Sequence, residues 1–171
     1  MCGISGFCSF DENYTGEREK WLRVLTDMRL AIAHRGSDQT GEYLKENVGL
    51  SHTRLSIRDV DGGLQPMCRR AGGFDYVIVY NGEVYNTEEL VPALKKKGYV
   101  FETTGDTEVI LYTYMEYGPD CVSMLNGIFA FAIWDGRLKR LLLCRDRLGV
   151  KPLFYSLKNG LLVFGSEIKA L

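Results

Sequence analysis

The sequence has no long apolar run and no paired-cysteine pattern, and both absences restrict what the protein can be. No stretch approaches the roughly 20 apolar residues that a membrane-spanning helix needs, and Asp11 and Glu12 follow the apolar start too soon for a signal peptide. The five cysteines are odd in number, scattered and without a C-x-x-C pair, so neither a disulfide framework nor a zinc site is expected. His34 and His52 lack metal-ligand spacing and are interpreted as structural or loop residues. These features favour a reducing, cytoplasmic location without a membrane partner.

The sequence also lacks a strong charge of either sign. Its 21 basic and 22 acidic side chains leave a formal net charge of −1. The one basic run, three lysines at 95–97, is explained as the last turn of a helix, where the helix dipole favours cations. Nucleic acid is therefore not expected as a partner. With 46% hydrophobic residues, no internal repeat and no low-complexity linker, 171 residues suit a single domain with a proper core.

Hydrophobic periodicity and turn residues predict three helices and several short strands. Asn86, with Glu89 three residues later, is typical of a capped helix start, and Gly98 is typical of a helix end. Helices are expected at about 18–33, 87–97 and 107–117, and strands at 4–10, 49–57, 74–80, 127–135, 140–146, 153–156 and 161–165. Asp-Gly at 135–136 and Asn-Gly at 159–160 predict hairpin turns. Strands joined by hairpins, with helices gathered in two places, predict an α+β domain built on antiparallel sheet.

The most informative stretch is the N-terminus, Met-Cys-Gly-Ile-Ser-Gly-Phe. Removal of Met1 would make Cys2 the first residue, with its thiol and a free α-amine on the same carbon. A thiolate is a reactive nucleophile, and an α-amine is partly unprotonated near neutral pH. One residue would then supply both nucleophile and base, as in the N-terminal threonine hydrolases. Because every chain has some second residue, this reading depends on what accompanies Cys2.

Three other positions have both a structural and a chemical reading. Arg54, at the end of a predicted strand, could pair with a carboxylate of the protein or clamp a substrate carboxylate. Asn81-Gly82 is a tight turn on local grounds, but an Asn amide with a Gly N–H can also form an oxyanion hole. Asp106 is either a helix N-cap or a carboxylate for a substrate ammonium. Together with Cys2, the chemical readings describe a site that holds an amino acid at both ends and attacks its side-chain amide, which is a glutaminase.

Several stretches also resemble one known family over essentially the whole chain and in order. The chain resembles the glutaminase domain of glutamine-hydrolysing asparagine synthetases, which are class II amidotransferases with an N-terminal nucleophile. Arg-Leu-Ser-Ile at 54–57 favours this type over the glucosamine-phosphate and purine-pathway relatives. The stretches that match are 1–7, 34–41, 54–57, 80–86, 105–108, 127–132 and 145–153.

The resemblance implies a fold, a set of roles and a reaction. The fold is a four-layer αββα sandwich of two antiparallel sheets, the N-terminal nucleophile hydrolase fold. The reaction is attack on the glutamine amide, release of ammonia and hydrolysis of a glutamyl thioester by water, with no cofactor in this domain. The implied roles are Cys2 as nucleophile, Asn81 and Gly82 as oxyanion hole, Arg54 for the glutamine α-carboxylate, Glu83 and Asp106 for its α-ammonium, and the main chain around Ile57 as the rest of the pocket.

The chain departs from the family pattern in two residues and in length. Ser37 replaces a usual proline and Arg58 a usual aliphatic residue, from which we expect a looser loop and little loss. Residues 1–171 are expected to form the amidotransferase domain alone, whereas family members continue into an ATP- and Mg-dependent synthetase domain that receives the ammonia and can form a homodimer. If Met1 stays attached, the α-amine is an amide and the base is missing.

Two alternatives follow from these departures. The chain could be the same half of a related amidotransferase that amidates another carboxylate. It could instead be a non-catalytic binding domain that keeps Met1. Loss of Cys2, Arg54, Asn81 or Asp106 would be expected in such a domain, and all four residues are present.

Overall fold

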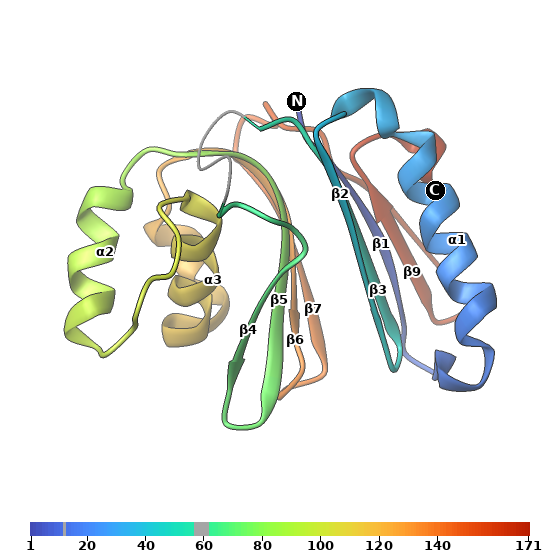
Figure 1. The fold of residues 1–171 in the computed structure, drawn as a ribbon, viewed down its shortest axis with the longest axis horizontal. Helices are drawn as coiled ribbons and strands as arrows, with labels where there is room; N and C mark the ends of the chain where they lie inside the picture. The colour runs from blue at the N-terminus through green and yellow to red at the C-terminus, as the bar shows by residue number, and fades with distance from the viewer. Residues whose placement is uncertain (12, 57–61) are drawn as a thin grey trace.

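Two antiparallel sheets stack face to face and carry helices on both outer faces (Figure 1). The computed structural model describes residues 1–11, 13–56 and 62–171. The α-helices are α1 (Arg18–Ala31), α2 (Thr87–Lys96) and α3 (Asp106–Tyr117). The strands are β1 (Gly3–Ser9), β2 (Gln39–Lys45), β3 (Val48–Arg54), β4 (Met67–Ala71), β5 (Phe74–Val84), β6 (Gly127–Asp135), β7 (Arg140–Arg145), β8 (Phe154–Lys158) and β9 (Leu161–Gly165).

The layers follow the order helix, sheet, sheet, helix. The five-stranded sheet runs β2-β3-β1-β9-β8 and carries α1, while the four-stranded sheet runs β4-β5-β6-β7 and carries α2 and α3 (Figure 1). Four 3-10 turns complete the described elements: η1 (Tyr14–Glu17), η2 (Ala33–Arg35), η3 (Gly118–Met124) and η4 (Ile168–Ala170). The predicted α+β fold, a four-layer αββα sandwich, is confirmed. Within the described residues, no helix is both long and apolar enough to cross a bilayer.

Period-two alternation of side chains builds the core between the sheets. In β1, Ile4 and Cys8 face the second sheet, whereas Phe7 faces α1. In β5, Val77 and Val79 face the first sheet in the same way. Each inner strand therefore contributes to two apolar layers, which is why both sheets are covered on both sides.

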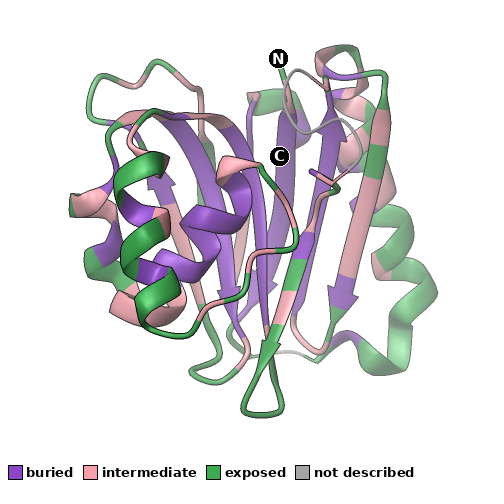
Figure 2. Ribbon diagram, turned by 60° about the vertical axis from the view of Figure 1, so that its left-hand side comes forward, coloured by how far each residue is buried: buried purple, intermediate pink, exposed green. Residues whose placement is uncertain are grey.

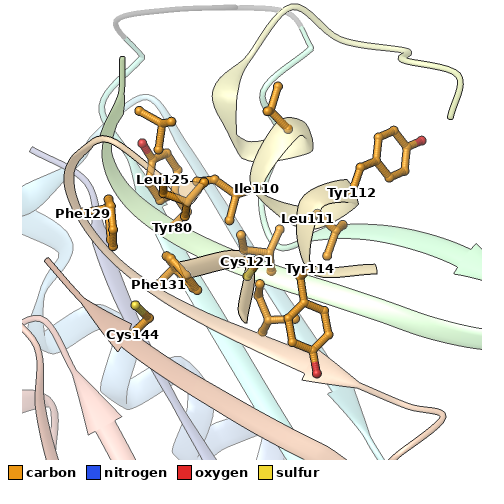
Figure 3. Close-up of a cluster of buried hydrophobic side chains, with 14 of the residues drawn as sticks. Tyr80, Ile110, Leu111, Tyr112, Tyr114, Cys121, Leu125, Phe129, Phe131 and Cys144 are labelled. Carbon is orange, nitrogen blue, oxygen red and sulfur yellow. The ribbon is translucent and has the colours of Figure 1, made fainter. Parts of the chain in front are cut away.

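The largest apolar cluster lies between the four-stranded sheet and α3 (Figure 3). The residues of α3 from Thr107 to Tyr114 are buried, whereas α1 is largely exposed on its outer face (Figure 2). Cys121 and Cys144 lie in this cluster. Burial raises the pKa of the Cys121 thiol to about 12 and that of Cys144 to about 11, so neither is a reactive thiolate near neutral pH.

Two strands and three local assignments differ from the sequence predictions. β2 and β4 were not predicted, because β2 is a polar edge strand and β4 contains two arginines in five residues. Asn81-Gly82 does not end its strand, because β5 continues to Val84. Asn86 occupies the N-cap of α2, but its side chain bonds the backbone of Met124 and Asn126 instead of its own helix. The predicted strand 49–57 ends early, at Arg54, because the N–H groups of Leu55 and Ser56 bond the Cys2 sulfur and Asp38 Oδ2 instead of a neighbouring strand; Ile57 lies outside the described residues.

Candidate active site

A pocket of about 160 Å³ opens where the start of β1 and the ends of β3 and β5 meet the start of α3. Six of the seven predicted site residues line it, although they come from four separate parts of the chain. The seventh, Ile57, lies outside the described residues. The lining consists of Met1, Cys2, Arg54, Leu55, Gly63, Gln65, Tyr80, Asn81, Gly82, Glu83, Gly105, Asp106, Thr107 and Lys151.

The same alternation that builds the inter-sheet core brings these side chains together. Cys2 precedes the buried Ile4 by two residues and shares its face of the sheet. Asn81 follows Val79 by two, and Arg54 obeys the same rule in β3. The site is therefore the polar end of the apolar layer between the sheets.

The Cys2 sulfur lies beside the backbone of Leu55. The Leu55 N–H approaches Sγ at 3.5 Å, and Sγ lies 3.6 Å from the Leu55 carbonyl oxygen. Gly3 follows Cys2 and is packed closely, since a Cβ there would lie 2.7 Å from a methyl carbon of Thr53. Cys2 is only half-buried, so its sulfur is both held by its neighbours and open to the pocket.

Asn81 carries a buried donor that is not used inside the protein. The residue is 3% exposed, and its Nδ2 has no hydrogen-bond partner among the described residues. Burial of an unpaired amide donor costs free energy, about 1–3 kcal/mol. A donor left unpaired beside a half-buried thiol is what an oxyanion hole requires before substrate arrives.

The Gly82 N–H lies on the pocket side of β5. Backbone N–H groups of alternate residues in a strand point to the same edge. The Tyr80 N–H donates to Gln65 Oε1 at 2.6 Å and the Val84 N–H to Asp106 Oδ2 at 2.9 Å, both away from β6. The Gly82 N–H lies between them on that edge. A side chain at Gly82 is excluded, because a Cβ would lie 2.3 Å from the Ile128 carbonyl oxygen.

Asp106 links the start of α3 to β5. Gly105, not Asp106, is the N-cap of α3, so the predicted N-cap role is wrong. Instead, Oδ2 of Asp106 accepts hydrogen bonds from the Tyr80 hydroxyl at 2.6 Å and the Val84 N–H at 2.9 Å. Oδ1 has no hydrogen bond among the described residues. Glu83, on the same face of β5 as Asn81, adds a second carboxylate to the pocket.

Arg54 is buried, and residues that follow η2 contact both its side chain and its backbone. Its Nη1 donates to Gln39 Oε1 at 2.6 Å, and its carbonyl accepts from the Asp38 N–H at 2.9 Å. Gly36 packs against the Arg54 backbone so closely that a Cβ there would lie 2.4 Å from the Arg54 carbonyl carbon. The stretch 34–41 thus has a physical role, which is to place the guanidinium in the pocket. Its use as a substrate clamp stays a prediction.

His52 connects the two sheets next to the pocket, through the backbone of Tyr80, which lines the pocket. The ring is 1% exposed, and its Nε2 lies 3.1 Å from the Tyr80 carbonyl oxygen on the facing strand. Burial lowers the pKa of His52 to about 4, so the ring is neutral near pH 7. It is therefore the structural residue that its lack of metal-ligand spacing suggested.

His34, in η2, is exposed and pairs with Glu167. Within the described residues, no His, Cys, Asp or Glu cluster is arranged to hold a metal ion.

The structure adds pocket residues to which no role was assigned from sequence. Gln65 bridges two elements, since it accepts from the Tyr80 N–H and its Nε2 lies 3.4 Å from Thr107 Oγ1. Lys151 enters the pocket rim, with Nζ 3.6 Å from the Met1 sulfur. Lys151 lies in a stretch that carried the family resemblance, 145–153, which was the one sequence signal for it. Nothing in the periodicity around Gln65 indicated its place.

A cysteine directly after Met1, in one pocket with an amide donor that is unused among the described residues, at the end of an αββα sandwich, is typical of the N-terminal nucleophile hydrolases. The Glutamine amidotransferase domain family matches residues 1–171. "Asparagine synthetase [glutamine-hydrolyzing] 3" of Bacillus subtilis (strain 168) is 46% identical over 171 residues, which cover 100% of this chain and 27% of that protein. "Asparagine synthetase B [glutamine-hydrolyzing]" of Escherichia coli (strain K12) is 39% identical over 172 residues, covering 100% and 30%.

The solved structures agree on the fold. The glutamine phosphoribosylpyrophosphate amidotransferase from B. subtilis superposes with a TM-score of 0.79 at 20% identity, over 99% of this chain and 42% of that one. The chain belongs to the glutamine amidotransferase domain family. It spans only 22–35% of the length of the curated relatives it matches.

Proposed function

We propose that this domain hydrolyses L-glutamine to L-glutamate and ammonia through a cysteinyl thioester on Cys2. The observation that carries the proposal is the buried, unpaired Nδ2 of Asn81 in the same pocket as the Cys2 thiol. An unsatisfied buried donor lowers the stability of a domain without any benefit if the domain is not catalytic. In a catalytic domain, the oxyanion of a tetrahedral intermediate would accept a hydrogen bond from it. Family membership supports the same activity.

The bound glutamine is held at its two ends. The Arg54 guanidinium binds the α-carboxylate as a bidentate donor. Asp106 and Glu83 receive the α-ammonium, and Oδ1 of Asp106 has no competing hydrogen bond within the described part of the chain. Two carboxylates opposite one guanidinium select a zwitterionic amino acid and leave its side chain directed along the pocket towards Cys2.

The reaction proceeds in two halves once Met1 has been removed. The α-amine of Cys2 takes the thiol proton, Sγ attacks the amide carbon, and the oxyanion accepts hydrogen bonds from Asn81 Nδ2 and the Gly82 N–H. The amine then passes the proton to the leaving nitrogen, which departs as ammonia and leaves a glutamyl thioester. Water, activated by the same amine, attacks the thioester and releases glutamate and the free thiol. While Met1 is attached, the amine is an amide and this base is absent.

For the whole protein, we propose that the ammonia is used by a downstream synthetase domain that makes asparagine from aspartate with ATP and Mg. The names of the relatives support this role. The alternative is transfer to another carboxylate. The test is to supply the longest natural form of the protein with glutamine labelled at its amide nitrogen, ATP, Mg and aspartate. Labelled asparagine supports the proposal, whereas ATP use only with a different carboxylate favours the alternative.

A cytoplasmic location, supported by five free cysteines, and a homodimer also stay proposals.

A further inference from the structure

Cys2 lies just outside the strand that follows it. β1 begins at Gly3, and its pairing with β3 begins with Gly3 opposite Thr53. Once Met1 is removed, Cys2 is attached to the chain only through its carbonyl carbon. Rotation about the N–Cα bond of Gly3 swings the Cys2–Gly3 peptide plane and, with it, the thiol and the α-amine together, and chain ends stay mobile unless other groups hold them.

Arg35 holds the carbonyl group of Cys2. The Arg35 Nε–H donates to the Cys2 carbonyl oxygen at 3.0 Å, and the arginine side chain is 8% exposed. The carbonyl oxygen and the Cα of Cys2 lie in the plane of the peptide bond to Gly3, so the position of the oxygen sets that of the Cα. A fixed carbonyl oxygen therefore restrains the rotation that would displace the nucleophile and its base.

Glu167 in turn holds Arg35. Glu167 Oε1 accepts from Arg35 Nη1 at 2.9 Å, so a single guanidinium connects Cys2 with Glu167. His34 Nε2 lies 2.8 Å from the same oxygen. The hydrogen bonds from Arg35 and His34 lower the pKa of Glu167 to about 2, which keeps the pair charged near neutral pH.

The segment that carries Glu167 is itself anchored to β1. The Ser166 N–H donates to the Ile4 carbonyl at 2.8 Å, and the Ile4 N–H donates to Ser166 Oγ at 3.0 Å. η4 follows at once and packs beside α1, near the C-terminus marked in Figure 1. Arg35 therefore connects two residues that are both next to β1: Cys2 directly precedes the strand, and Glu167 follows the residue that bonds Ile4. The connection from Glu167 through Arg35 to Cys2 is rigid for this reason.

We propose that Arg35 and Glu167 form a positioning pair that sets the orientation of the Cys2 thiol and α-amine for attack. The proposal rests on the proposed function of Cys2. Neither residue touches the glutamine in this account, and their contribution is made through the Cys2 backbone.

The test uses the protein with Met1 removed and a Cys68→Ser background, because Cys68 is an exposed thiol that would obscure labelling of Cys2. Arg35→Met, Glu167→Gln and the double variant are compared with Lys169→Ala. Lys169 contacts the other oxygen of Glu167 at 3.3 Å and serves as the matched control. The readouts are kcat and KM for glutamine, the rate of Cys2 alkylation by iodoacetamide, and the thermal unfolding midpoint.

Arg35→Met is expected to lower kcat about 100-fold, the scale of a misplacement of about 1 Å. Glu167→Gln is expected to lower it about tenfold, with KM in both within about twofold, since the glutamine-binding residues are unchanged. The double variant should match Arg35→Met alone, because both residues act through one contact. Lys169→Ala should behave like the parent.

A purely structural role gives a different pattern. The unfolding midpoint would then fall while kcat of the folded protein stayed unchanged, or the two single effects would add, and either result overturns the proposal. Alkylation separates this failure from failure of the glutaminase itself. If the parent does not hydrolyse glutamine, the positioning pair still predicts slower alkylation of Cys2 in both single variants and not in Lys169→Ala, and equal rates in all four proteins overturn it.

Discussion

At the scale of single residues, the site is defined by groups whose bonding capacity the protein leaves unused. Within the described residues, the buried amide donor of Asn81 has no partner, and both hydrogen bonds of the Asp106 carboxylate go to Oδ2. Each unused group matches a different part of glutamine. The carbonyl oxygen that becomes an oxyanion needs donors, and the ammonium needs acceptors.

Asn81→Ala removes one of the two oxyanion donors. Because the donor acts on charge that develops in the transition state, kcat should fall about 10²–10³-fold, or about 3–4 kcal/mol, with little change in KM. Steady-state glutamate release measures both constants. Stability should not fall much, because the variant also removes a buried unpaired donor. A variant with normal kcat would show that Asn81 is not part of an oxyanion hole.

Asp106→Asn should act on binding. The amide keeps an oxygen for the Tyr80 hydroxyl and the Val84 N–H but loses the negative charge that attracts the ammonium. KM for glutamine is expected to rise at least tenfold, with a smaller change in kcat. Competition by glutamate and by a glutamine analogue without the α-amine provides the check: the variant should lose the preference for the ammonium. An unchanged preference contradicts the assignment.

How much of the site could be predicted differs from residue to residue. Cys2, Arg54, Asn81 and Asp106 were predicted because their side chains have chemistry that a sequence displays. Gln65 was not, because its role depends on two partners, Tyr80 and Thr107, brought close only by folding. Local reading also assigned Asn81-Gly82 to a turn, since Asn-Gly favours turns wherever no tertiary contact opposes it.

At the scale of elements, the pocket is built by close backbone contacts at glycines. Gly82 lies against β6, and Gly36 lies against the backbone of Arg54. In both places the absence of Cβ, not backbone flexibility, is what the structure uses. The strands β2 and β4 could not be predicted from the sequence. Both are edge strands with polar residues, and such strands show little of the periodic alternation on which strand prediction depends.

Gly36→Ala tests this view of the loop after η2. The new Cβ would lie 2.4 Å from the Arg54 carbonyl carbon, so the loop and the end of β3 must separate. We expect a loss of about 1–3 kcal/mol in the free energy of unfolding and a higher KM through displacement of Arg54. Gly16→Ala is the matched control, because nothing lies within 4 Å of a Cβ there. Urea unfolding and glutaminase kinetics on both variants make the comparison, and equal behaviour would contradict the account.

At the scale of the whole molecule, the two sheets are joined at the site by a neutral histidine. The pKa of His52 is about 4 in the folded protein because of burial, against about 6.5 when exposed. Between these pH values the unfolded chain binds a proton that the native protein does not. Stability from this group is therefore complete above pH about 6.5 and is lost as the pH falls to about 4, by up to about 3 kcal/mol.

His52→Gln provides the test of this pH dependence. The glutamine amide can still donate to the Tyr80 carbonyl but does not titrate. Urea unfolding at about pH 7.5 and about pH 4.5 should show that the wild type loses about 2–3 kcal/mol more than the variant over this interval. Carboxylates such as Glu167 titrate in both proteins and cancel in the comparison. An equal loss in wild type and variant would contradict the buried, neutral state of His52.

The fold class was predicted from the arrangement of strands and helices, and the family resemblance specified the αββα layers. The resemblance could not identify the acceptor of the ammonia, because the chain spans only 22–35% of the length of its curated relatives. The claim that can be tested on this chain alone is the chemistry at Cys2.

The most direct measurement is glutamate release from glutamine by the chain with Met1 confirmed absent by intact mass, beside Cys2→Ala and a form that retains Met1. The account predicts activity in the processed chain, none in Cys2→Ala, and none in the unprocessed form because its base is an amide. Undiminished activity in Cys2→Ala, or an inactive processed chain that also fails to form a covalent adduct on Cys2 with a glutamine-like electrophile, would contradict it.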